Sequence, residues 1–149
     1  MNISPENIKQ KVENPFPFIK RMGVKALELK PRYVKLQAPL QRNENHIGSM
    51  YAGALFTLAE MLCGALYMTT FDFSLYYPIL KEMKIQFSRP AKTDVTAEIG
   101  LPEAESERIE AEAKEKGKSE FVLFGEIKDE SGDTIAVSKG VYQLRAFGT

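Results

Sequence analysis

The sequence predicts an α+β domain in which one antiparallel sheet wraps around a single long helix. Two extended runs before residue 40 and four after residue 72 lie on either side of one apolar helical segment, residues 53–71. Strands grouped on both sides of one helix favour this layered arrangement. The 149 residues are the size of one domain, and an apolar fraction of 44% is enough for a core. We therefore expect residues 1–149 to form a single domain.

A short helix is predicted first, from Pro5 to about Glu13. Ser4 suits its N-cap, and proline suits the first helical position. Pro15 and Pro17 are expected to end this helix, because proline lacks the N–H that a helix needs. Three apolar residues then offer a surface that docks on the body of the domain: Phe16, Phe18 and Ile19.

Extended segments follow on both sides of the long helix. In residues 33–40, apolar and polar side chains alternate with the period of a strand that has one buried face. Residues 102–116 are rich in Glu, Ala and Lys and stop at Gly117, which predicts a mostly exposed helix. Ser131-Gly132 suits a hairpin turn. The remaining strands are predicted over residues 24–30, 82–90, 95–101, 120–128 and 134–145.

The long helix has two different faces. One face carries apolar residues at helical spacing and is expected to contact the sheet: Leu55, Leu58, Leu62, Ala65 and Leu66. At 100° per residue, the opposite face carries Gly53, Phe56, Glu60, Gly64, Tyr67 and Phe71. This second face has one carboxylate between two glycines, which leaves space beside the acid. A helix so apolar is not covered by one sheet, so we expect a partner subunit or a ligand to cover the rest.

Composition excludes several classes of function. Acidic and basic residues balance at 20 each, so no global field attracts nucleic acid or an anionic membrane. The single cysteine, Cys63, allows no internal disulfide, and one histidine, His46, excludes zinc sites built on several histidines. The polar start lacks the pattern of a secretory signal, and the apolar stretch 52–67, broken by Glu60, is expected to be too short for a bilayer. We therefore expect a cytoplasmic protein that binds neither nucleic acid nor membrane.

The segment from Asn45 to Glu60 carries the functional information. It reads NHIGSMYAGALFTLAE, with a polar loop, a Tyr-Ala-Gly step into the helix and an acid two turns later. This segment resembles the signature of hotdog thioesterases of the phenylacetyl-CoA type, and most closely a bacterial subgroup whose motif ends in Ala-Glu. Residues 85–90 also resemble the family's strand ending in Arg-Pro. The resemblance implies a hotdog fold and hydrolysis of an acyl-CoA or a related acyl thioester.

The resemblance also assigns roles by position. Asn45 and Gly48 match the family's Asn and Gly, Gly53 matches the second Gly of its His-Gly-Gly step, and Glu60 matches its acid. Tyr51 and Ala52 replace that step's His and first Gly. These departures remove one possible hydrogen bond to the thioester carbonyl and add a methyl group where the backbone meets the substrate. Water is the only co-substrate implied; the coenzyme A thioester is the substrate, and no metal or other cofactor is expected.

The chemistry fits these residue types. A thioester carbonyl becomes negatively charged under attack and needs donors already aimed at it. The first N–H groups of a helix have no internal partners, so Ala52 and Gly53 are candidate donors. A carboxylate such as Glu60 either attacks the carbonyl or activates a water, and the sequence leaves both roles open.

Four further residues are candidates for substrate binding. Phe56 and Gly64 share the face of Glu60 and are expected to border its pocket. Arg89 and Lys92 flank Pro90 at a strand end, where they are candidates for binding the phosphates of coenzyme A. A solvated strand end is the other interpretation of these two cations.

Two alternative functions stay open at this point. The altered Tyr51-Ala52 pair keeps open a hotdog protein that binds acyl-CoA without hydrolysing it. His46 and Glu60 have a separation similar to that of the His-Glu pair in hotdog hydroxyacyl-thioester dehydratases, although the Pro-Gly step of those enzymes is Ala52-Gly53 here and is shifted. In every case we expect a homodimer or a dimer of dimers, with loop 45–53 beside the partner's helix.

Overall fold

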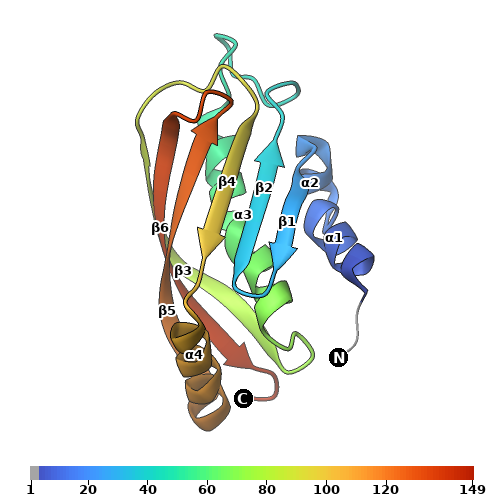
Figure 1. The fold of residues 1–149 in the computed structure, drawn as a ribbon, viewed down its shortest axis with the longest axis vertical. Coiled ribbons are helices and arrows are strands. Elements are labelled where there is room, and N and C mark those ends of the chain that lie inside the picture. The colour runs from blue at the N-terminus through green and yellow to red at the C-terminus, as the bar shows by residue number, and fades with distance from the viewer. Residues whose placement is uncertain (1–3) are drawn as a thin grey trace.

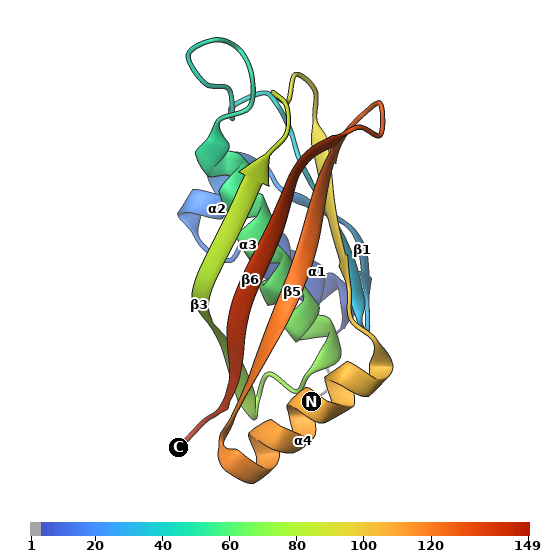
Figure 2. The same ribbon diagram turned by 90° about the vertical axis from the view of Figure 1, so that its left-hand side faces the viewer.

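The structure, a computed structural model, describes residues 4–149. Six strands form one antiparallel sheet in the order β1-β2-β4-β5-β6-β3 (Figure 1). The sheet curves around the long helix α3, which contacts every strand and lies behind β3, β6 and β5 in Figure 2. This arrangement confirms the predicted α+β fold. The elements are α1 (Pro5–Glu13), α2 (Pro17–Met22), β1 (Lys25–Lys30), β2 (Tyr33–Ala38), α3 (Ala52–Thr70), β3 (Tyr76–Phe87), β4 (Val95–Gly100), α4 (Glu103–Lys116), β5 (Lys118–Asp129) and β6 (Thr134–Ala146).

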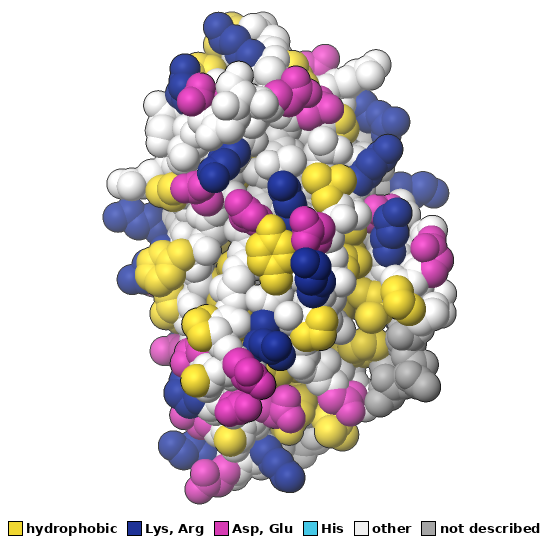
Figure 3. Space-filling model, in the orientation of Figure 1, with side chains coloured by type: hydrophobic (Ala, Val, Ile, Leu, Met, Phe, Trp, Pro, Cys, Tyr) yellow, Lys and Arg dark blue, Asp and Glu magenta, His cyan; other side chains and the backbone are white. Residues whose placement is uncertain are grey.

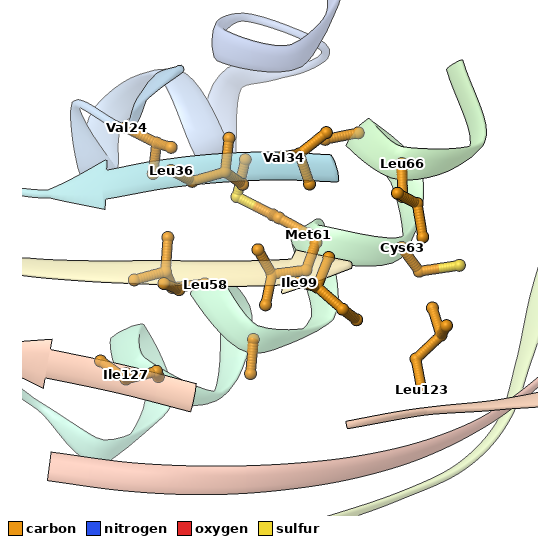
Figure 4. Packing of buried hydrophobic residues seen from close by; sticks show 14 of the residues in the cluster. Val24, Val34, Leu36, Leu58, Met61, Cys63, Leu66, Ile99, Leu123 and Ile127 are labelled. Atoms are coloured by element: carbon orange, nitrogen blue, oxygen red, sulfur yellow. The ribbon is translucent and has the colours of Figure 1, made fainter. Parts of the chain in front are cut away.

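The core lies between α3 and the inner face of the sheet. The predicted apolar face of α3 is buried, and the inward residues of β2 alternate with half-buried ones as expected. Figure 4 shows Leu58, Cys63 and Leu66 of α3 among core side chains of the surrounding strands. At Gly125 of β5 the helix comes close to the sheet, because a Cβ there would lie 3.0 Å from Leu62 Cδ1. A glycine therefore sets the depth to which α3 sinks into the curved sheet.

The N-terminal segment differs from the prediction in one respect. Ser4 caps α1 as expected, with its side chain accepting the Asn7 N–H. Pro17, expected only to end a helix, begins the second helix α2, since proline fits the first helical position. Ile19 of α2 docks on the body and is buried, whereas Phe16 and Phe18 remain about half exposed, at 54% and 50%. Only part of the expected apolar surface is thus used for docking.

β3 is longer than predicted and forms an edge of the sheet. Met83, Ile85 and Phe87 pair with buried residues of β6 and so face the same inner side. They nevertheless stay half-buried or exposed, and Phe87 is 47% exposed. The expected buried face is therefore incomplete, because β3 is the edge strand of the described sheet and pairs only with β6.

The C-terminal elements agree with the sequence patterns. α4 is mostly exposed and ends at Gly117, whose φ of 82° is the left-handed conformation of a helix C-cap. Three of its residues, Ser106, Ile109 and Ala113, are buried at spacings of three and four. Gly132, with a φ of 84°, lies in the turn between β5 and β6 as predicted.

By length and composition alone, α3 would be able to cross a membrane, since its 19 residues include a stretch of mean hydropathy 1.4. The expectation that this segment is too short was therefore wrong on that criterion. Half of the stretch is buried inside the described structure. Core helices pass the same test, and packing against the curved sheet accounts for the high hydropathy of α3.

Candidate active site

The loop that leads into α3 is held in place by a buried asparagine, Asn43. Its side-chain amide donates hydrogen bonds to the carbonyls of Met22 (2.9 Å) and Pro39 (2.8 Å). Its own carbonyl accepts the N–H of Tyr51 at 2.8 Å, directly before the helix. Asn43 is 7% exposed. It therefore ties the end of α2, the end of β2 and the start of α3 together.

Asn45, the asparagine expected in the site, instead organises the turn of the same loop. Its Oδ1 accepts the N–H groups of Ile47 (2.9 Å) and Ser49 (3.1 Å). Gly48 has a φ of 84°, and no described atom lies within 4 Å of the position its Cβ would take. The turn requires glycine there for its backbone conformation. His46 is exposed in this turn and is absent from the lining of the cavity, described below, that holds Glu60.

Tyr51 occupies the N-cap position of α3, and Ala52 and Gly53 form its first two residues. No side chain in the described part of the chain caps this helix start. The N–H groups of Ala54 and Leu55 already donate to the Tyr51 carbonyl, at 3.0 and 3.2 Å. A Cβ on Gly53 would lie 2.3 Å from the ring of Tyr51, which is 60% exposed. Gly53 therefore makes room for Tyr51, a reason for glycine that the motif alone does not reveal.

Glu60 lies two turns further along α3, half-buried, beside an apolar cavity of about 260 Å³. Burial raises the pKa of the Glu60 carboxyl above its ordinary value, and among described residues no other group contributes to this shift. A carboxylate without a compensating partner in an apolar setting is expected to behave this way. The cavity borders Glu60 and Gly64 on α3, Val12 on α1, and Phe16 and Ile19 around α2. Phe56, 37% exposed, lies on the same side of α3 but does not line the cavity.

Two further titratable groups lie close to Glu60 in the interior. Cys63 is buried, and burial followed by the charge of Glu60 raises the pKa of its thiol. This agrees with its interpretation as a small buried apolar residue. Tyr142 of β6 is 3% exposed, and the pKa of its hydroxyl is raised by burial, by Cys63 and by Glu60. Its ring lies over Gly140, where a Cβ would meet it at 2.4 Å.

Arg89 and Lys92 lie on the connection between β3 and β4, next to the loop before α3. The N–H of Met50 donates to the carbonyl of Ala91 at 2.8 Å, which joins the two segments. Arg89 forms an exposed ion pair with Asp133 at 2.9 Å, and Lys92 is exposed. An exposed pair contributes little free energy, so it does not prevent Arg89 from binding another anion.

Comparison with known proteins places this arrangement in a family. The model of the domain of unknown function DUF4442 matches residues 5–144. The chain belongs to the DUF4442 family. No curated protein matches it. A Pseudomonas aeruginosa protein of unknown function, described as a probable thioesterase, is 46% identical over 98% of both chains, with a TM-score of 0.93.

More distant structures share the fold of this DUF4442 protein. A Chlorobaculum tepidum protein of unknown function is 21% identical over 94% of this chain and 93% of its own, with a TM-score of 0.82. A Haemophilus influenzae thioesterase is 15% identical over 100% of this chain and 95% of its own, with a TM-score of 0.77. The DUF4442 chain thus has the hotdog fold, as the sequence predicted.

The DUF4442 structure brings together only part of the predicted set. Glu60 and Gly64 share one cavity, whereas Tyr51 and Gly53 line a separate hollow at the start of α3. Arg21 and Arg42 line this second hollow and were missed, because no motif spacing connects α2 to the loop before α3. Asn43 and Tyr142 were missed for a similar reason, since their importance depends on contacts far apart in the sequence.

Proposed function

We propose that this protein hydrolyses an acyl-CoA or a related acyl thioester to the free acid and the thiol. One observation carries the proposal: a half-buried carboxyl group, Glu60, borders an apolar cavity without a described partner. Acids whose pKa is shifted by burial beside a cavity are candidates for catalytic groups. The names of the relatives, which include thioesterases, support the same reaction.

In the proposed mechanism Glu60 acts as nucleophile or as general base. As nucleophile it forms an anhydride with the acyl group and expels the thiolate, and water then releases the acid. As base it takes a proton from the water that attacks the carbonyl. Both routes need the ionised carboxylate. Backbone N–H groups at the start of α3, Ala52 and Gly53, stabilise the negative oxygen in either route.

We further propose that the working unit is a homodimer or a dimer of dimers. The open inner face of β3, with Met83, Ile85 and Phe87, is an apolar surface at a sheet edge, and the adjacent face of α3 carries Phe56 and Glu60. Exposed apolar surface of this kind is typical of interfaces. Glu60 also lies eight residues, about 12 Å along the helix axis, beyond Ala52. In a two-fold dimer, loop 45–53 of one subunit would lie beside Glu60 of the other.

The surface charge of the protein is compatible with a small-molecule substrate. Figure 3 shows acidic and basic side chains interspersed on the face it presents. A surface of mixed charge supports a small-molecule substrate over nucleic acid or an anionic membrane. We propose a cytoplasmic protein that needs no metal or other cofactor.

The test is thiol release from a panel of acyl-CoAs. We expect wild-type protein to release thiol, and Glu60→Gln to lower kcat by about 10² to 10⁴ while binding survives. Glu115→Gln, on the exposed helix α4, is the matched control and should leave kcat unchanged. His46→Ala should be mild.

Three outcomes would contradict the proposal. Unchanged kcat in Glu60→Gln removes Glu60 from the mechanism. Hydration of an enoyl-thioester by the wild type without thiol release, lost to a similar extent in Glu60→Gln and His46→Ala, identifies a dehydratase. Binding of acyl-CoA by calorimetry without thiol release from any of them identifies a non-catalytic binder.

A further inference from the structure

Gly64 is a glycine in the middle of α3 that packing within the described chain does not require. Glycine destabilises a helix interior relative to alanine, because it loses more backbone freedom on folding. At Gly125 and Gly140 close neighbours explain the glycine, with atoms at 2.8 and 2.4 Å from a built Cβ. At Gly64, by contrast, no described atom lies within 4 Å of that position. The space beside Gly64 is therefore kept clear for something other than residues 4–149.

That space belongs to the cavity beside Glu60. Gly64 lies one turn beyond Glu60, and both line the same cavity of about 260 Å³. Most of its other walls are apolar, among them Val12, Phe16 and Ile19 from the α1–α2 segment and Met68 further along α3. The polar side chains besides Glu60 that line it are Lys11 and Tyr67. Val12 and Ile19 are buried, so the α1–α2 segment is anchored, while Phe16 is 54% exposed at the rim. An acyl chain whose carbonyl lies at Glu60 and which runs past Gly64 would thus enter the cavity, with the α1–α2 segment as one wall.

We propose that this cavity holds the acyl group of the substrate, and that the substrate is an uncharged acyl thioester of medium chain length. The inference rests on the proposed thioester hydrolysis at Glu60. An apolar cavity of about 150 Å³ can bind benzene, with six carbons. By the same scale, about 260 Å³ accommodates about ten carbons. Of the polar wall residues, Lys11 is exposed and the Tyr67 hydroxyl already donates to the Tyr76 carbonyl at 2.6 Å. Polar groups on the acyl chain would therefore lie mainly against apolar walls, which disfavours charged or hydroxylated substrates.

The expected result is a rise in kcat/KM with chain length that stops when the cavity is full. Burial of each methylene group should raise kcat/KM about fourfold. The rise should continue up to acyl groups of about ten carbons and level off beyond them. The measurement is thiol release from straight-chain acyl-CoAs, acetyl to palmitoyl.

Three variants and a matched control test the walls. Gly64→Leu fills the cavity with four carbons and should shift the preferred chain to a shorter length by about that number. Phe16→Ala opens the rim and should extend the preference to longer chains. Phe18→Ala removes the same side chain from the same segment at similar exposure but outside the Glu60 cavity, so it should leave the chain-length profile unchanged. Gly64→Ala, which strengthens the helix, guards against a folding defect and should shift the profile in the same direction by less.

Failure of this inference can be distinguished from failure of the proposed hydrolysis. If wild-type protein releases no thiol, calorimetry with the same acyl-CoAs still tests the cavity, and affinity should follow the same dependence on chain length. A flat profile in both measurements would overturn the inference. So would a Gly64→Leu protein that becomes monomeric in light scattering with its chain-length profile unchanged, because the space would then belong to the partner subunit.

Discussion

Replacing Asn43 by alanine should weaken the fold more than replacing Asn45, although both lie in the same loop. Asn43→Ala removes two hydrogen bonds, to the Met22 and Pro39 carbonyls, at 2.9 and 2.8 Å. The bond to Met22 is buried, so an unsatisfied carbonyl there costs about 1–3 kcal/mol, and the part-buried bond to Pro39 contributes about 0.5–1.5 kcal/mol. We therefore expect the free energy of unfolding to fall by about 2–4 kcal/mol.

Urea denaturation measures this loss, and thermal unfolding should show a decrease in Tm of roughly 5–15 °C for a chain of this size. Asn45→Ala is the matched control: its Oδ1 accepts two N–H groups within one turn, through one exposed and one part-buried hydrogen bond, so about 0.5–1 kcal/mol should be lost. Activity should fall in Asn43→Ala as well, because the side chain fixes the backbone of residue 43, whose carbonyl accepts the N–H of Tyr51 before the helix. Equal losses of stability in the two variants, or a loss below about 1 kcal/mol in Asn43→Ala, would refute the reasoning.

Other predictions concern the site and the assembly. Because burial raises the pKa of Glu60, its ionisation destabilises the folded state at pH 7. Glu60→Gln should therefore unfold at a higher urea concentration than wild type at pH 7. The difference should vanish as the pH falls below the ordinary glutamate pKa of 4.5. Equal midpoints at pH 7 would show that the acid is not destabilising. Replacing Arg89 and Lys92 together by alanine should raise KM for acyl-CoA at low salt and leave kcat nearly unchanged, since only uniform binding is lost; an unchanged KM would leave both as solvated surface. Light scattering should show a dimer or a tetramer at micromolar concentration, and an active monomer would rule out the shared site. Mixing Glu60→Gln chains with inactive Gly53→Val chains should restore part of the activity, because one site of each mixed dimer then has both groups intact; no recovery in confirmed mixed dimers would place both groups in one subunit.

The secondary structure of this chain was largely predictable from residue spacing. The alternation in β2 and the apolar face of α3 are local patterns, and the structure buries the residues that they indicate. The position of Glu60 on the less buried face of α3 also follows from helical geometry alone. Pro17 was harder to interpret, because proline fits both the end of one helix and the start of the next.

The site was predictable to a lesser extent. Asn43 and Asn45 are two positions apart in a polar loop, and only contacts with Met22 and Pro39 distinguish the anchoring residue from the turn residue. Gly53 and Gly64 lie on the same helix face, yet one makes room for the Tyr51 ring and the other borders empty space. Within each pair the residue type is the same and both residues lie in the same local element. Residue type and spacing therefore cannot tell which residue of the pair has which role.

The sequence by itself determined the local elements, the single acid of the long helix and the apolar faces that must be buried. Periodicity reports backbone geometry over a few residues, and that geometry is set by the chain itself. Only the tertiary structure decided which residues meet: the α1–α2 segment over the cavity beside Glu60, the Arg89–Lys92 connection against the loop before α3, and the open inner face of β3. These depend on burial and hydrogen bonds between segments far apart in the chain, because a side chain's environment is created by the elements that pack around it.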